Sequence, residues 1–160
     1  MRDHLRQDAG ECRVAAIGRR VLVPTDFSET SHAALVCAVS LVERCDASLH
    51  LLHVVEAIVG AEPLGRHPGV LSDVERAVER SVLEELRDLL SADDHARLRV
   101  RLAVEWGTAT VEILRYARSH DVDLIAMGRH GRSGIKHVLL GSVADKVVCH
   151  APCAVLSVGY

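Results

Sequence analysis

Aromatic residues are scarce in this chain of 160 residues, in which Phe, Trp and Tyr together amount to 2%. Stacking of bases on aromatic side chains, a common way to hold single-stranded nucleic acid, is therefore not available. An excess of basic residues is missing as well, because 19 Lys and Arg stand against 22 Asp and Glu, for a formal net charge of −3. From these two absences we expect no nucleic-acid partner and no membrane-surface partner.

Long apolar runs are also absent. No stretch of about 18 apolar residues occurs, and the opening sequence MRDHLRQDAGECRVAAIG is polar and charged. The five cysteines form no CxxC pair, and the chain holds no asparagine that could accept a glycan. These features predict a cytoplasmic protein without a membrane span or secretion signal, in which Cys37, Cys45, Cys149 and Cys153 are buried as small apolar side chains.

The composition that is present is that of a globular protein. Hydrophobic residues make up 49% of the chain and charged residues 26%, which is far from the profile of a disordered chain. The length allows one domain. We therefore expect a single domain over residues 18–160 and a mobile tail over residues 1–17.

Short β-like runs alternate with helical ones along the chain, which is the pattern of a parallel sheet covered by helices. Apolar runs predict strands at Arg20–Pro24, Ser48–Val55, Leu98–Val104, Asp123–Gly128 and Ala154–Val158. Amphipathic spacing predicts helices at Ser31–Cys45, Ser72–Ser91, Ala109–His120 and Ser142–His150. In the third strand Arg99 and Arg101 alternate with apolar residues, which suits a strand at the edge of the sheet.

Glycines gather between the fourth strand and the last helix. Gly128 and Gly131 follow the strand, and Gly141 with Ser142 opens the helix. Glycine lets backbone amides approach an anion closely, and a helix N-terminus offers unpaired N–H groups at the positive end of its dipole. We therefore favour a phosphate site here over the alternative of ordinary glycine turns with Ser142 as an N-cap.

The spacing Gly128-x2-Gly131-x9-Gly141-Ser142, together with the run VLVPTDFS that begins at Val21, closely resembles the ATP-binding branch of the universal stress protein family. The resemblance covers roughly residues 20–158. It implies a flavodoxin-like or Rossmann-like α/β fold, a doubly wound five-stranded parallel sheet with strand order 3-2-1-4-5. It also implies a homodimer formed through the last strand, Ala154–Val158.

The resemblance further implies a set of contacts to ATP, or to ADP or AMP, bound with Mg²⁺. Those to the nucleoside come from Pro24, Thr25, Asp26, Val54, Met127 and Gly128, and those to the phosphates from Gly131, Arg132, Gly141, Ser142 and Val143. Asp26 would reach the ribose or the metal, because a carboxylate next to bare phosphates is repelled. The alternative for Asp26 is a turn or N-cap acid that acts together with Ser28.

Other kinds of site find no support. The chain contains no Gly-x4-Gly-Lys-Ser/Thr loop and no GxGxxG after its first strand. Its histidines lack metal-ligand spacing, and His50 and His53 should face opposite sides of the sheet. His130, inside the glycine loop, is interpreted as a solvent-exposed residue. No residue is predicted to be catalytic or to bind a metal directly.

The sequence therefore favours an ATP-binding regulatory module of the stress response over an enzyme. Two alternatives stay open. One is slow ATP hydrolysis or phosphate transfer, and the other is a nucleotide-free dimeric adaptor whose glycines serve only as turns.

Overall fold

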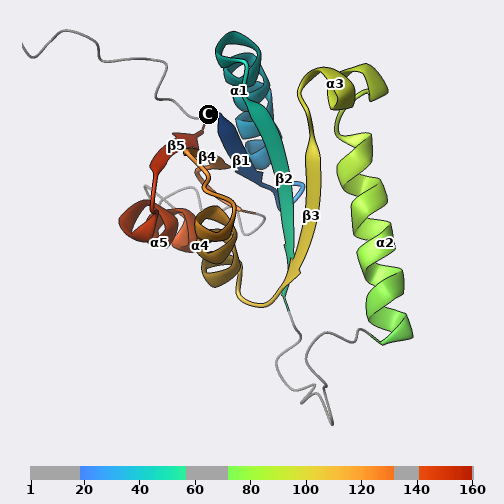
Figure 1. Cartoon of the computed structure of the whole chain (residues 1–160). Coiled ribbons are helices and arrows are strands. Elements are labelled where there is room, and N and C mark those ends of the chain that lie inside the picture. The colour runs from blue at the N-terminus through green and yellow to red at the C-terminus, as the bar shows by residue number, and fades with distance from the viewer. Residues whose placement is uncertain (1–18, 57–71, 132–140, 160) are drawn as a thin grey trace, which may run out of the picture.

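The computed structural model describes residues 19–56, 72–131 and 141–159 (Figure 1). Its strands are β1 (Arg20–Pro24), β2 (Ser48–Val55), β3 (Arg101–Trp106), β4 (Leu124–Gly128) and β5 (Ala154–Val158). Its helices are α1 (Glu29–Cys45), α2 (Asp73–Asp88), α3 (Ala92–Arg97), α4 (Ala109–Ser119) and α5 (Ser142–His150). The tail predicted at 1–17 lies outside these residues.

The strands form one parallel sheet in the order β3-β2-β1-β4-β5, which confirms the predicted doubly wound fold. β3 lies at an edge, as its alternating charges predicted. The chain moves from β1 to β2 on one side and returns to β4 on the other, so the strand order reverses between β1 and β4. Such a reversal leaves a crevice outside the carboxyl ends of the two strands.

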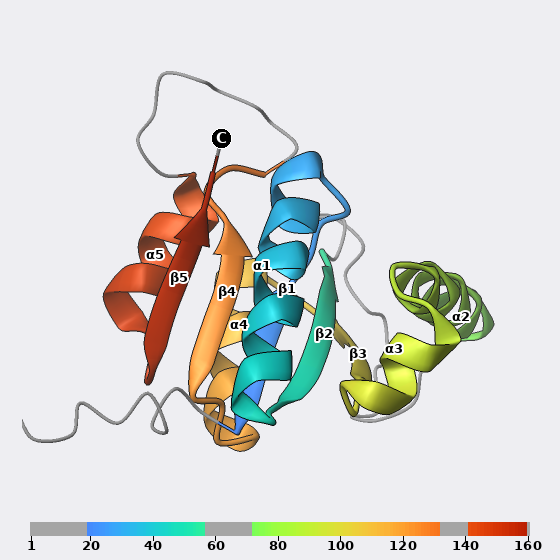
Figure 2. The ribbon, with the colours of Figure 1, turned by 90° about the horizontal axis from the view of Figure 1, so that it is seen from above.

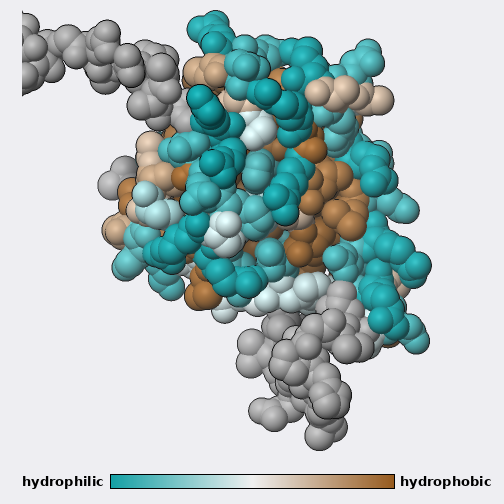
Figure 3. All heavy atoms as spheres, in the orientation of Figure 1, coloured by the Kyte–Doolittle hydropathy of each residue, from teal (hydrophilic) through white to brown (hydrophobic). Residues whose placement is uncertain are grey.

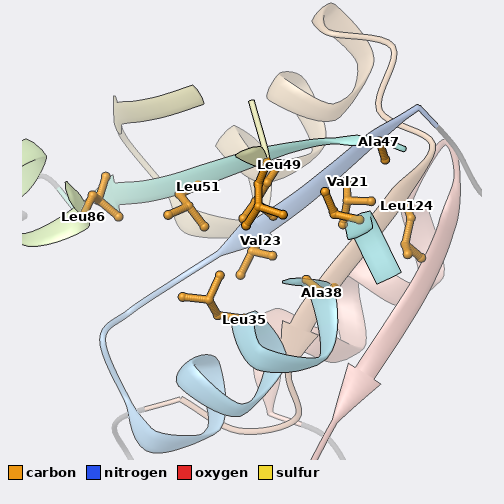
Figure 4. Close-up of a cluster of buried hydrophobic side chains, with 12 residues drawn as sticks. Val21, Val23, Leu35, Ala38, Ala47, Leu49, Leu51, Leu86 and Leu124 are labelled. Atoms are coloured by element: carbon orange, nitrogen blue, oxygen red, sulfur yellow. The ribbon is translucent and has the colours of Figure 1, made fainter. Parts of the chain in front are cut away.

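Helices cover both faces of the sheet. α1 and α2 supply one apolar core, and α4 and α5 supply the other (Figure 2). In the first core Leu35 and Ala38 of α1 lie against Val21 and Val23 of β1 (Figure 4). These side chains are at most 2% exposed. Full burial of one valine or leucine side chain stabilises the fold by roughly 1.5–3 kcal/mol.

The predicted second helix is wrong at its end, and the predicted third strand is wrong at both ends. α2 ends at Asp88 and not at Ser91, and β3 spans Arg101–Trp106 and not Leu98–Val104. Ser91 starts the separate helix α3, because its Oγ accepts the N–H of Asp94 at 3.1 Å. Leu98, expected in the strand, is buried after α3 in the core that α2 also enters. The residues of α3, ADDHAR, include no large apolar side chain, so apolar spacing does not reveal this helix.

The expectation of buried cysteines is wrong for two of them. Cys37 on α1 and Cys149 on α5 are exposed, whereas Cys45 and Cys153 are half-buried. Each helix offers only one stripe to the sheet, and these two residues lie outside that stripe.

α2 lies beside the edge strand β3, and apolar side chains remain at the surface between the two elements (Figure 3). Val82 of α2 and Leu102 and Val104 of β3 are half-buried there. Val74, nearer the start of α2, is 73% exposed. Among the described helices none is long and apolar enough to span a bilayer.

Candidate functional site

A cavity of about 180 Å³ lies where the strand order reverses, at the carboxyl ends of β1 and β4. It has room for several water molecules, each of which occupies about 30 Å³. The structure brings together there every predicted site residue that it describes. These are Pro24, Thr25, Asp26, Val54, Met127, Gly128, Gly131, Gly141, Ser142 and Val143. Arg132 lies outside the described residues.

Thr25 is held by hydrogen bonds at each of its polar groups. Its N–H donates to Leu52 O at 2.9 Å, and its carbonyl accepts from His53 Nδ1 at 2.8 Å. Its hydroxyl accepts the N–H of Phe27 at 3.0 Å and shares a bond with Ser31 Oγ at 3.0 Å. The residue is 7% exposed. Its hydroxyl therefore shapes the turn after β1, and its backbone forms part of the cavity wall.

Asp26 is a turn acid that acts together with Ser28, which was the alternative to a ligand role in the sequence. Its Oδ1 accepts from the N–H of Ser28 at 3.1 Å and from Ser28 Oγ at 2.6 Å, as a turn acid does. Ser28 is also the N-cap of α1, which therefore begins at Glu29, two residues earlier than predicted. The other oxygen, Oδ2, lies toward Gly131, where an added Cβ would stand 3.0 Å from it. The carboxylate thus faces the glycine loop across the crevice.

Gly128 permits the close approach of β4 to α1. A Cβ at this residue would stand 2.9 Å from the N atom of Ser31 and 2.9 Å from the carbonyl carbon of Thr30. The Thr30 hydroxyl also donates to the carbonyl of His130, beyond the strand. The first turn of α1 therefore rests directly on the backbone that enters the glycine loop.

The N-terminus of α5 opens into the cavity without a side-chain cap. Gly141 is the N-cap, so the alternative that Ser142 fills this position is wrong. Serine side chains cap α1, α2 and α3, whereas among the described residues no side chain caps α4 or α5. The first amides of a helix have no partner within it. The amides of Ser142 and Val143 thus stand at the positive end of the α5 dipole, where an anion is stabilised.

Several lining residues were not found from the sequence. Arg129 and His130 occupy the two positions between Gly128 and Gly131, and neither was predicted to contact a ligand. His130 is half-buried, so its interpretation as a solvent-exposed residue is wrong. Their place inside the motif was the only available signal. The apolar wall includes Ile113 of α4, which amphipathic spacing alone does not assign to a site.

The two histidines of β2 face opposite sides of the sheet, as predicted. His50 is buried on the α4 side, where its Nδ1 lies 3.1 Å from the hydroxyl of Tyr116. His53 lies against the ring of Phe27, with ring centroids 4.8 Å apart. The described part of the chain contains no cluster of three or more His, Cys, Asp or Glu side chains suited to a metal ion.

The chain is thus an α/β protein with a doubly wound sheet and a glycine-lined crevice at the switch point, the place where open α/β sheets bind their ligands. Residues 18–159 match the model of the Universal stress protein family, and the chain belongs to this family.

Known proteins agree with this assignment. Universal stress protein A homolog 2 of Coxiella burnetii is 34% identical over 149 residues, which cover 88% of this chain and 94% of that protein. The solved UspA of Lactobacillus plantarum is 27% identical, with a TM-score of 0.66, and the match covers 88% of this chain and 97% of the other. A universal stress protein solved in complex with cAMP is 24% identical, with a TM-score of 0.62, covering 88% and 96%.

Proposed function

We propose that this chain is an ATP-binding regulatory module of the stress response. The observation that carries the proposal is the crevice between β1 and β4, where the uncapped N-terminus of α5 and the Asp26 carboxylate face one cavity. A nucleotide needs an apolar place for its base, an acceptor for its ribose and N–H groups for its phosphates. The relative that holds cAMP supports an adenine nucleotide as the ligand.

The lining residues fit these three needs. Val54 at the end of β2, Met127 of β4 and Ile113 of α4 provide apolar contact for the adenine. Phosphates would accept hydrogen bonds from the amides of Ser142 and Val143. A Cβ at Gly131 would stand 3.0 Å from Asp26 Oδ2, and one at Gly141 would stand 3.3 Å from Arg129 O, so a side chain at either position would crowd the glycine loop.

Mg²⁺ would enter with the nucleotide. Phosphate and carboxylate oxygens are the ligands that this ion prefers, and it commonly uses one carboxylate together with substrate phosphates. Asp26 is the carboxylate that lines the described cavity. Its role is therefore either to complete the coordination of Mg²⁺ or to accept the ribose hydroxyls, and these two roles respond differently to removal of the metal.

A homodimer through β5 belongs to the same proposal. β5 lies at the edge of the sheet, and its Val155 and Leu156 are only half-buried. An apolar edge strand invites pairing with another strand, and an isologous dimer provides that partner. The cytoplasmic location stays a prediction from the sequence.

The test is a calorimetric titration of ATP, with and without Mg²⁺, into nucleotide-free wild type and into Gly131→Ala/Gly141→Ala. We expect the wild type to bind and the double variant to bind at least about tenfold more weakly, because the two methyl groups crowd Asp26 and the backbone of the glycine loop. Urea unfolding of the double variant beside the wild type is the control for a general loss of fold. Absence of binding by the wild type would contradict the proposal and favour the nucleotide-free adaptor.

A further inference from the structure

The cavity contains one permanent positive charge among its described lining residues, Arg129. The described lining otherwise carries the Asp26 carboxylate and the titratable side chains of His53 and His130. A triphosphate brings several negative charges. Amides at a helix terminus contribute only about 0.3–1 kcal/mol per charge. A guanidinium adds a charge-assisted bond to phosphate that is about twice as strong as a neutral one.

The backbone of Arg129 is fixed on both sides. Its N–H donates to Val158 O at the end of β5, with a distance of 2.6 Å. Its carbonyl accepts the N–H of Gly141, the N-cap of α5, at 2.8 Å. The side chain of Arg129 therefore starts from a point that is tied directly to the helix terminus proposed to hold the phosphates.

The stem of Arg129 runs over Gly159, the residue that follows β5. A Cβ at Gly159 would stand 2.8 Å from Cδ of Arg129 and 3.1 Å from its Cβ. No other residue type leaves this room. The path of the arginine side chain is thus determined by a glycine 30 residues further along the sequence.

We propose that Arg129 binds the β- and γ-phosphates of the nucleotide and that Gly159 positions its side chain to do so. The inference rests on the proposed function and extends it, because it assigns the preference between a triphosphate and a monophosphate to one residue. Through the contact between Gly159 and Arg129, the end of β5, the strand proposed to form the dimer, is linked to the phosphate site.

The test compares the affinities for ATP and AMP by calorimetry in wild type, Arg129→Gln, Arg129→Lys and Gly159→Ala. Arg129→Gln should weaken ATP binding by about tenfold to a hundredfold and leave AMP binding within about twofold. The ATP affinity of Arg129→Lys should lie between those of the wild type and Arg129→Gln, because lysine keeps the positive charge and loses the planar guanidinium. Gly159→Ala should weaken ATP binding by displacing the arginine stem.

The double variant Arg129→Gln/Gly159→Ala is the matched control. If Gly159 acts through Arg129, its substitution changes nothing further once the guanidinium is gone. An unchanged ratio of ATP to AMP affinity in Arg129→Gln would overturn the inference and leave the proposed function standing. An equal loss of affinity for ATP and for AMP would mean that Arg129 supports the fold, and this result would overturn the inference as well. If the wild type binds neither nucleotide, both proposals fall.

Discussion

The carboxylate of Asp26 faces Gly131 across the crevice so closely that a Cβ on the glycine would stand 3.0 Å from Oδ2. Asp26 follows β1, and Gly131 belongs to the loop after β4. The two residues are far apart in sequence and meet because β1 and β4 are neighbours in the sheet. Their meeting places an acid opposite the glycine loop, where we propose that the phosphates bind.

Asp26→Ala distinguishes the two roles considered for this carboxylate. If Asp26 completes the coordination of Mg²⁺, the variant should lose about tenfold in ATP affinity with the metal and little in EDTA. If Asp26 accepts from the ribose, the loss should be the same in both conditions. Calorimetry with and without Mg²⁺ gives the answer, and unchanged affinity in both would contradict a ligand role.

Ser28→Ala is the control for that experiment, since Asp26 also shapes the turn. The variant removes the hydroxyl that donates to Asp26 Oδ1 and that caps α1 at the N–H of Ser31. It should lower the free energy of unfolding by about 1 kcal/mol, the usual effect of a lost N-cap. It leaves the carboxylate in place, so its effect on nucleotide affinity should not depend on Mg²⁺.

Gly128→Ala should destabilise the fold itself. The added Cβ would stand 2.9 Å from backbone atoms of Thr30 and Ser31, and a helix backbone cannot move aside as a side chain can. We expect a loss of about 1–3 kcal/mol in urea unfolding, as for other overpacked sites. Gly159→Ala, whose methyl group would meet only the side chain of Arg129, should cost far less. Equal stabilities would contradict the packing role of Gly128.

His50 should make the protein sensitive to mild acid. Burial, helped by the positive charges of Arg101, His120 and Arg20, lowers the pKa of His50 from 6.5 to about 4. The unfolded chain therefore binds this proton at a higher pH than the folded protein does. The stability that His50 contributes is fully present above pH 6.5 and is lost as the pH falls toward 4. The loss between pH 7 and pH 5 should be about 2 kcal/mol.

Urea unfolding at pH 7 and pH 5 measures that loss. The variant His50→Leu/Tyr116→Phe removes the titrating ring together with its hydroxyl partner, so no buried polar atom is left alone. Its stability should change by about 2 kcal/mol less between the two pH values than that of the wild type. The same pH dependence in both proteins would contradict the assignment to His50.

Charges on β5 should separate the dimer. Ala154 and Ser157 are exposed on this edge strand. Lysine at both positions opposes edge-to-edge pairing without removing the strand from β4. We expect light scattering to give a dimer for the wild type and a 17.4 kDa monomer for Ala154→Lys/Ser157→Lys. Ser40→Lys/Ser119→Lys adds the same charge on α1 and α4 and should remain dimeric; a dimeric β5 variant would refute the interface.

The sequence predicted the sheet and the cavity because both depend on local signals. Apolar runs such as Val21–Val23 and Leu49–Leu52 identify buried parallel strands, since helices cover both of their faces. The spacing of Gly128, Gly131 and Gly141 identified the loop, because only glycine leaves room for close backbone approach.

What the sequence did not predict depends on contacts between distant residues. The contact of Arg129 with Gly159 exists only because β4 and β5 end side by side. α3 was missed because its six residues, ADDHAR, include no large apolar side chain and so show no apolar spacing. The exposure of Cys37 follows from the direction in which α1 packs, which composition does not fix.

The most direct test of the nucleotide site is a titration of ATP into ¹⁵N-labelled protein followed by amide chemical shifts. The crevice predicts that the largest changes fall on Gly131, Ser142 and Val143, with smaller ones on Asp26 and Val54. The amide chemical shift of Tyr116, whose hydroxyl contacts the buried His50, should stay unchanged. Absence of shifts at saturating ATP, or shifts that gather away from the ends of β1 and β4, would contradict the account.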